Sequence, residues 1–331
     1  MITHTGKFGK RVWEKGRAMT GRRFSRNGFT IVELIVAVSV IAILVGLLIP
    51  AVSMARSASH RIQCANQLRQ IGLAMHTYEA SYGVFPAATS GSPSARSFLV
   101  ALLPHIDQKN LFNSINFSFD LMNIGPQNRT ASSVRINVLH CPSDNVDRPG
   151  WPVATSYAGN QGGGVQKYGP NGVFPGLTAV RLRDISDGTS NTAAMSEWVI
   201  GPVSPALRDP LGSVFRTATE YSRPDELDLF TNLCRYIDLN SASVTTHPKG
   251  VNWLFGELGY SLYNHVLPPN EKSCLNGTAY QQGAWTASSR HRNGTNLLFA
   301  DGRVEFYRNH VDQAVWRALA SRNGGELAVQ Q

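Results

Sequence analysis

The side chains in this sequence with the most obvious chemical potential are a histidine and an aspartate near its C-terminal end. His291 and Asp301, with any of several serines, could be drawn as a hydrolase triad. No Gly-x-Ser-x-Gly segment, the turn that exposes a nucleophilic serine, accompanies them. The run Gly162-Gly163-Gly164 lacks the lysine and the hydroxyl residue of a phosphate-binding loop. The sequence therefore predicts no enzyme, and we interpret His291 as a structural residue that forms hydrogen bonds to a hairpin.

A short polar loop offers oxygen atoms of the kind that calcium binds. Asp184, Asp187 and Asn191 are its candidate ligands. The same residue types are also typical of tight turns, because their short side chains accept hydrogen bonds from nearby backbone N–H groups. Turn chemistry explains the segment without an ion. We therefore predict no metal and no cofactor, with calcium as the alternative.

The sequence contains four cysteines, Cys64, Cys141, Cys234 and Cys274. No two of them have the close spacing of zinc ligands, so a zinc site is not predicted. Four cysteines allow three disulfide pairings. Cys64 falls on a helix face expected to pack on the body and Cys141 ends an expected strand, whereas the other two lie in an irregular segment. We therefore favour Cys64–Cys141 and Cys234–Cys274, and four free, partly buried thiols are the alternative.

A long apolar stretch lies near the N-terminus. Glu33 is the only charged residue among the 21 residues from 29 to 49. At about 1.5 Å per residue, a helix of this length crosses a hydrocarbon core of roughly 30 Å. An ionisable group inside such a helix is energetically expensive and is usually retained for a function. Glu33 is therefore a functional candidate.

The positive charge of the chain is concentrated before this stretch. Residues 1–28 contain eight Lys/Arg and one Glu, for a net charge of +7, whereas the remaining residues contain 23 basic and 21 acidic side chains, for +2. Such a basic segment beside a membrane helix is held on the cytoplasmic side of the membrane. The charge is thus a signal of membrane topology, and it gives no support to nucleic-acid binding.

The segment Gly28-Phe29-Thr30-Ile31-Val32-Glu33-Leu34, between the basic leader and the apolar run, resembles the N-terminus of type IV prepilins and type II secretion pseudopilins. The resemblance implies cleavage between Gly28 and Phe29 by a prepilin peptidase, N-methylation of Phe29, and Glu33 at the acidic position of the family. The alternative is an ordinary signal anchor, in which Glu33 is a tolerated polar residue near the membrane edge. A cleaved secretory signal peptide fits worse, because the apolar run is too long and no small-residue cleavage site directly follows it.

The helical pattern continues beyond Pro50, since a proline can bend a long helix without ending it. Six residues recur at spacings of three and four along one face: Cys64, Leu68, Ile71, Met75, Tyr78 and Tyr82. We expect one helix over 29–82, in which 29–50 is transmembrane and 51–82 is amphipathic. Gly83 is its expected C-cap.

Residues 83–331 are expected to form one globular domain outside the cytoplasm. The predicted elements are a helix over 97–112 that Pro104 can break, strands over 134–139 and 193–199, a hairpin over 296–307 with Asp301-Gly302 at its turn, and a helix over 311–320. Residues 201–280 show no clear period, so we interpret them as an insertion with local structure only. The predicted fold class is α+β and pilin-like, with the long helix packed on a C-terminal antiparallel β-sheet domain.

Further sequence blocks extend the resemblance over nearly the whole mature chain. They are Cys64-Ala65-Asn66-Gln67-Leu68-Arg69-Gln70-Ile71-Gly72, Cys141-Pro142-Ser143-Asp144, Asp187-Gly188-Thr189-Ser190-Asn191-Thr192 and Ser289-Arg290-His291. His291 and Asp301-Gly302 add an H-x9-DG motif. Together the blocks resemble a large planctomycete family of pilin-like proteins whose body is a domain of unknown function. The resemblance implies an architecture and an export route but no established activity. Compared with the usual compact body, residues 201–280 look expanded.

Two functions are compatible with these features. The first is a structural subunit with one pass through the cytoplasmic membrane, whose partners are the prepilin peptidase, other pilin or pseudopilin subunits and membrane lipid. In a filament, Glu33 would neutralise the amine of Phe29 in a neighbouring subunit and offset the cost of burying both charges. The second is a membrane-tethered module that binds a polysaccharide or a protein and does not polymerise. Its candidate contacts are aromatic residues in the loops of 142–280: Trp151, Tyr157, Tyr168, Tyr221, Tyr236 and Trp253.

Intact-mass measurement with and without reduction before alkylation tests the disulfide prediction. We expect no alkyl label without reductant, because sulfur atoms in a disulfide do not react, and four labels after reduction, one for each of the four cysteines. Uptake of four labels without reductant would show that the thiols are free.

Overall fold

The computed structural model describes residues 29–92, 94–121, 125–144, 153–165, 171–202, 204–221, 223–246, 248–279 and 282–325. The basic leader with Gly28, as well as Trp151 and Tyr168, lie outside the described residues. The chain divides into two compact units, Met1–Ser53 and Met54–Gln331. We describe each unit by itself.

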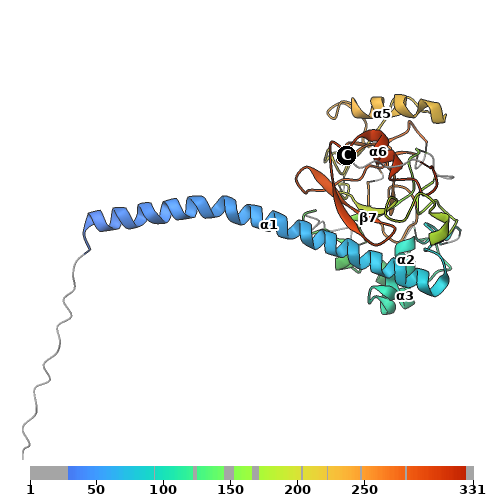
Figure 1. Ribbon diagram of the computed structural model, residues 1–331, viewed down its shortest axis with the longest axis horizontal. Coiled ribbons are helices and arrows are strands. Elements are labelled where there is room, and N and C mark those ends of the chain that lie inside the picture. The colour runs from blue at the N-terminus through green and yellow to red at the C-terminus, as the bar shows by residue number, and fades with distance from the viewer. Residues whose placement is uncertain are drawn as a thin grey trace, which may run out of the picture. The chain divides into compact units, whose positions relative to one another are not determined.

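A single helix, α1 (Ile31–Tyr82), accounts for the predicted N-terminal helix except its first two residues and contains Pro50 within it (Figure 1). A capping box begins the helix. Glu33 Oε2 accepts hydrogen bonds from Thr30 N over 2.9 Å and Thr30 Oγ1 over 2.8 Å, and Glu33 N donates to Thr30 Oγ1 over 3.3 Å. The large apolar side chains of residues 31–52 are all exposed. Among the described helices, α1 is the one long and apolar enough to cross a membrane.

In the second unit, residues 54–82 of α1 bury one face. The buried residues are Cys64, Ala65, Leu68, Ile71, Gly72, Ala74 and Met75. The predicted stripe is thus right as far as Met75, but Tyr82 is 64% exposed, because its ring lies against the partly buried Tyr78 (centroids 4.4 Å apart) and not in the core. Gly83 ends the helix at φ +71°, and its N–H donates to Glu79 O over 2.7 Å.

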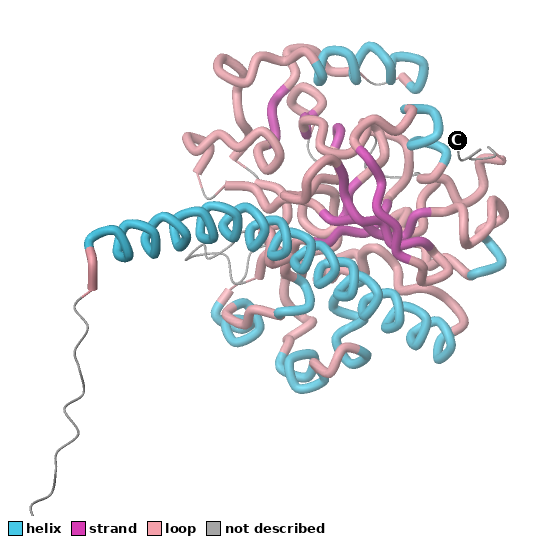
Figure 2. The backbone as a smooth tube through the Cα atoms, turned by 60° about the vertical axis from the view of Figure 1, so that its left-hand side comes forward, coloured by secondary structure: helices cyan, strands magenta, loops and turns pink. Residues whose placement is uncertain are grey.

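Two sheets form the framework of the second unit (Figure 2). The five-stranded sheet has the order β4 (Leu262–Tyr263), β1 (Tyr157–Asn160), β2 (Ala193–Glu197), β7 (Gly294–Phe299) and β8 (Val304–Arg308). Its pairs are antiparallel except for β1 with β4. The three-stranded sheet has the order β3 (Val214–Arg216), β5 (Ser273–Leu275) and β6 (Gly283–Ala284). The α+β fold class, a long helix with an antiparallel-rich sheet domain, is confirmed.

Helix α1 packs closely on the five-stranded sheet because one of its residues has no side chain. A Cβ atom added to Gly72 would lie 2.8 Å from Leu298 Cδ1 on β7. Ala65 and Ala74 lie on the same buried face and also have small side chains. Periodicity based on large apolar residues misses these three buried positions, of which Gly72 allows the close approach.

Strands β7 and β8 form the predicted hairpin. Four residues separate the two strands, and the first three of them, 300–302, lie between Phe299 and Arg303, which are bonded to each other. Gly302 N donates to Phe299 O over 3.0 Å, and Phe299 N donates to Arg303 O over 2.8 Å. Gly302 has φ +90°, and Asp301 Oδ1 accepts from Arg303 N over 2.9 Å. This is the loop in which a turn is followed by a left-handed glycine, and it explains why Asp precedes Gly in the H-x9-DG motif.

The segment after α1 is more broken than the sequence predicts. The expected helix over 97–112 is α2 (Phe98–Leu102), a 3₁₀ turn η1 (Leu103–His105) that contains Pro104, and α3 (Lys109–Ser114). The strand predicted over 134–139 is wrong, because this segment ends in the 3₁₀ turn η3 (Asn137–Leu139). Asn137 O accepts a hydrogen bond from Gln67 Nε2 on α1 over 3.0 Å. This carbonyl group is therefore bonded to the helix and not to a neighbouring strand.

The remaining short helices are η2 (Pro126–Asn128), α4 (Arg129–Ser132), η4 (Leu182–Asp184), η5 (Pro224–Glu226), α5 (Leu227–Arg235) and α6 (Gln313–Ala318). The C-terminal helix α6 was predicted, and Asp312 caps it by accepting from Ala314 N and Val315 N.

Residues 201–280 do more than form local structure, so that expectation is wrong. They supply β3 and β5 of the smaller sheet, and β4 pairs with β1 in the larger one. Trp253 and Leu254 lie in the main hydrophobic core. The segment lacks a visible period because its strands are only two or three residues long.

His265 lies wholly buried where its neutral form is fully bonded. Nδ1 donates to Trp316 O over 2.8 Å, Nε2 accepts from the hydroxyl of Tyr263 over 2.7 Å, and the ring stacks on Trp316 with centroids 4.0 Å apart. Burial lowers the pKa of His265 to about 3, although the bond to Trp316 O acts in the opposite direction.

We therefore predict that acid destabilises the fold through His265. An unfolded histidine titrates near pH 6.5, so below that pH the unfolded chain binds a proton that the folded chain excludes. The free energy of unfolding, measured by urea denaturation in detergent, should fall from about pH 6.5 downward, by up to about 1.4 kcal/mol per pH unit for this group. The variant His265→Gln should lose that part of the slope, and His310→Gln, at an exposed position, should keep it. An equal slope in His265→Gln would contradict the prediction.

Candidate functional site

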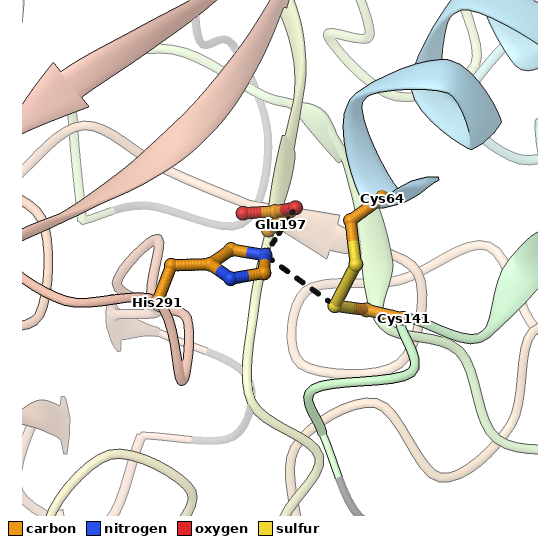
Figure 3. Close-up of side chains that lie close together, drawn as sticks. All are labelled: Cys64, Cys141, Glu197 and His291. Carbon is orange, nitrogen blue, oxygen red and sulfur yellow. Dashed lines mark hydrogen bonds and ion pairs between the residues drawn. A yellow bond between two sulfur atoms is a disulfide. The ribbon is translucent and has the colours of Figure 1, made fainter. Parts of the chain in front are cut away.

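Three of the sequence blocks meet in the second unit at one buried cluster (Figure 3). Cys64 comes from α1, Cys141 from the turn after η3, Glu197 from the end of β2, and His291 from the loop before β7. Their exposed fractions are 0%, 4%, 1% and 5%. One sulfur, nitrogen or oxygen atom of each side chain lies within 4.8 Å of those of the other three.

The two cysteines of the cluster form a disulfide. Cys64 is bonded to Cys141, with Cα atoms 5.1 Å apart, and Cys234 is bonded to Cys274, with Cα atoms 5.8 Å apart. This is the pairing that the sequence favoured. The first bond joins α1 to the turn after η3, and the second joins α5 to β5.

His291 lies between the disulfide and the carboxylate. Its Nε2 is 3.4 Å from Glu197 Oε1 and 3.6 Å from Cys141 Sγ. Nδ1 lies 3.3 Å from Ser143 Oγ, in the same short segment as Cys141. The side chain of His291 therefore contacts β2 and the Cys141 turn, and its connection to the hairpin strand β7 runs through Glu197.

Glu197 is the functional candidate that sequence reasoning missed. Its Oε2 accepts from Asn296 N over 2.9 Å and from Thr295 Oγ1 over 3.4 Å, and Oε1 accepts from Asn296 Nδ2 over 2.8 Å. These donors lie on β7, beside β2 in the sheet. A signal was present in the sequence, because Glu197 is the one charged residue in the strand predicted over 193–199.

A second polar layer surrounds the cluster. Asp144 Oδ2 accepts from Ile200 N over 2.9 Å, and Asp144 Oδ1 lies 3.8 Å from Arg290 Nε. Arg290 also forms an ion pair with Asp209. The blocks that contain Cys141 and His291 thus hold each other through Asp144 and Arg290 as well as through the histidine.

Comparison with protein families decides the family of the chain. A family described as "Protein of unknown function (DUF1559)" matches residues 53–314, and the "Prokaryotic N-terminal methylation motif" matches residues 23–49. The chain belongs to the DUF1559 family. No curated protein and no solved structure matches it.

The methylation motif covers Gly28, Phe29 and Glu33. The chain is accordingly a pilin-like protein of the kind that prepilin peptidase processes, and its apolar N-terminal helix fits an anchor in the inner membrane. The DUF1559 match contains all four residues of the cluster. The family description names no activity.

The calcium candidates of this DUF1559 protein bind backbone in the structure. The two oxygens of Asp187 accept from Gly324 N over 2.7 Å and Gly325 N over 2.9 Å. Asp184 Oδ2 accepts from Arg181 N, and Asn191 Nδ2 donates to Asp187 O. Asp184 and Asn191 thus form hydrogen bonds within a turn, as the turn interpretation describes. Asp187 also connects this turn to the C-terminal segment.

The aromatic candidates of the loops divide into two groups. Tyr157 and Trp253 are fully buried in the core, and the hydroxyl of Tyr157 donates to Gln67 Oε1 on α1 over 2.7 Å. Tyr221 is partly buried, and Tyr236 is 80% exposed. Of the four that the structure describes, only Tyr236 presents most of its ring to a ligand in solution.

Lys249 is a second buried charge-bearing residue that the sequence did not reveal. Its Nζ donates to Leu211 O over 2.8 Å, Ser288 Oγ over 3.0 Å and Thr286 O over 3.1 Å, and Ser273 Oγ lies 3.2 Å away. Burial lowers the pKa of Lys249 to about 7. The amine connects four segments. Within the described part of the chain it forms no hydrogen bond to the Cys64 cluster, which consists of Cys64, Cys141, Glu197 and His291.

Removal of the Glu197 carboxylate should destabilise the body strongly. In Glu197→Ala the buried N–H groups of Asn296 lose their acceptor, at a cost of about 1–3 kcal/mol for each orphaned donor. We expect a lower urea midpoint in the oxidised protein, an intermediate one in Glu197→Gln, and little change in the control Glu79→Ala, at a partly exposed position of α1. A Glu197→Ala midpoint equal to that of the control would show that the carboxylate is not a structural centre.

Proposed function

We propose that this DUF1559 protein is a structural pilin-like or pseudopilin-like subunit that assembles through α1 into a type IV pilus or a type II secretion-like filament. Cleavage between Gly28 and Phe29 and N-methylation of Phe29 precede assembly. The observation that carries the proposal is that the methylation motif of residues 23–49 coincides with a helix whose apolar side chains are exposed over residues 31–52. A helix that is apolar on all sides needs lipid or other apolar helices around it.

The geometry of Glu33 supports a role between subunits. Both bonds from Thr30 go to Oε2, so Oε1 has no partner among the described residues. After cleavage, the amine of Phe29 carries a positive charge into lipid, where an unpaired charge is expensive. Oε1 of Glu33 in a neighbouring subunit offers it a partner while Oε2 keeps the cap of its own helix. Such a pair offsets both burial costs and fixes the axial register of adjacent subunits.

The body fits an extracytoplasmic location. Two disulfides, such as those of the described fold, persist in oxidising compartments and are rare in the cytosol. The basic leader supports a cytoplasmic location for the N-terminus. The partners of the proposed subunit are therefore the prepilin peptidase, other subunits of its filament and membrane lipid, without nucleic acid.

The variant Glu33→Ala tests this proposal. We expect membrane insertion and leader cleavage to proceed, because the apolar run and Gly28 are unchanged, and we expect filament assembly to be lost. Sheared filament fractions and cleavage can both be followed by immunoblot. Normal assembly of Glu33→Ala would contradict the proposal.

The matched control is Thr30→Ala, which removes the capping hydroxyl but leaves the carboxylate. Loss of an N-cap costs about 1 kcal/mol. If Glu33 acts between subunits, Thr30→Ala assembles while Glu33→Ala does not. Equal loss in both variants would assign Glu33 to helix capping alone.

One observation favours the alternative of a membrane-tethered binding module. An open groove of about 520 Å³ lies beside the smaller sheet and α5, and its polar lining includes Arg216, Glu220 and Asp238. Chemical cross-linking in native membranes separates the two functions. A ladder of homo-oligomers supports the filament subunit, and a monomer linked to a foreign partner supports the binding module.

A further inference from the structure

The Cys64 cluster contains the donor atoms of a zinc site. It brings together two cysteine sulfurs, one imidazole nitrogen and one carboxylate oxygen, all of them types that bind Zn²⁺. We propose that, when the Cys64–Cys141 disulfide is reduced, Cys64, Cys141, Glu197 and His291 bind one zinc ion. The inference concerns the body alone and is independent of filament assembly.

Two of the distances between these atoms match tetrahedral coordination. With bonds of about 2.0–2.1 Å to nitrogen and oxygen and about 2.3 Å to sulfur, tetrahedral ligand atoms lie about 3.3 Å apart for N and O and about 3.5 Å for N and S. The observed separations from His291 Nε2 are 3.4 Å to Glu197 Oε1 and 3.6 Å to Cys141 Sγ. The other four separations are each at most 4.8 Å. After reduction, side-chain rotation opens the two sulfurs to about 3.8 Å and brings the remaining atoms to the tetrahedral separations.

The surroundings of the ligands hold them as the outer shell of a metal site does. Metal-bound histidines usually donate their other ring N–H to a fixed acceptor, and bound carboxylates are themselves hydrogen-bonded. Nδ1 of His291 faces Ser143 Oγ, a hydroxyl that can either donate or accept. Glu197 is held by Asn296 and Thr295 through both oxygens. Ser143 can therefore serve the tautomer with Nε2–H that faces Glu197 and the tautomer with free Nε2 that binds a metal.

The proposed site is structural and not catalytic. Each of its four side chains is at most 5% exposed, so no position is open to a substrate. A structural zinc site has four protein ligands and no exchangeable water. The ligands lie at positions 64, 141, 197 and 291. This spacing explains why the short cysteine motifs that indicate zinc in a sequence are missing.

The chemistry has two balanced steps. Two thiol groups of an external thiol reductant supply two electrons and two protons, so the disulfide becomes two Cys thiols and the reductant becomes a disulfide. Zn²⁺ then binds both sulfurs as thiolates and releases two protons. In both states the same residue of α1 stays attached to the same turn of the body. The metal would replace the covalent bond.

Metal titration of the full-length protein in detergent micelles tests the proposal. The protein is reduced with a phosphine under anaerobic conditions, freed of reductant and titrated with Co²⁺, whose tetrahedral thiolate complexes absorb visible light, and then with Zn²⁺. We expect one ion per chain in the reduced protein and none in the oxidised protein. Equal binding by the oxidised protein, or no binding after reduction, would overturn the proposal.

Variants assign the ligands. His291→Ala and Glu197→Gln should each weaken zinc binding by at least about tenfold, since changes even in the outer shell of a metal site cost about 10–100-fold. His310→Ala is the matched control at an exposed histidine, and Cys234→Ser with Cys274→Ser controls for the other cysteine pair. Both controls should keep the full affinity. Binding that follows Cys234 and Cys274, or that survives both ligand variants, would overturn the proposal.

X-ray absorption at the zinc edge decides the outcome even where a ligand variant fails to fold. In the reduced, unsubstituted protein we expect two sulfur neighbours at about 2.3 Å and two nitrogen or oxygen neighbours at about 2.0–2.1 Å. A shell of four sulfurs, or one without sulfur, would refute the site.

Discussion

A buried carboxylate must be surrounded by donors, and much of the body depends on how Glu197 meets this requirement. Removing a charge-bearing group from water is costly unless hydrogen bonds replace the lost hydration. Glu197 finds its donors on β7, while His291 approaches it from the loop before that strand. His291 in turn contacts the Cys141 turn, which is bonded to α1. One buried acid thereby connects the sheet, the hairpin, a loop and the helix.

This arrangement gives a physical meaning to the blocks that carry the family resemblance. The block with Cys64 supplies the helix side of the disulfide, the block with Cys141 supplies its partner and Ser143, and the block with His291 supplies the imidazole. The block of residues 187–192 lies elsewhere, where Thr189 O accepts from Asp301 N at the hairpin turn. The motif residues therefore hold distant parts of the chain together, which fits a body that is built to be rigid around α1.

The two units use opposite solutions to the same problem of apolar surface. The body covers one face of α1 with its own core, including Leu68, Ile71 and Met75. The N-terminal part of the helix leaves every large apolar side chain exposed and keeps one carboxylate among them. The first solution makes a stable domain, whereas the second demands lipid or neighbouring helices. This pilin-like protein combines both solutions in one chain.

The sequence by itself determined the N-terminal methylation motif, the long helix, the hairpin and the fold class, because each depends on local chemistry or on a period that neighbouring residues carry. It failed where distant residues decide the outcome. Residues 134–139 alternate like a strand but are held by Gln67, and residues 201–280 enter both sheets through strands too short to show a pattern. Sequence reasoning favoured the Cys64–Cys141 pair of the buried cluster but did not assemble the rest of it, for the same reason. Its four residues come from four separated segments, and only tertiary packing brings Glu197 and His291 to the disulfide.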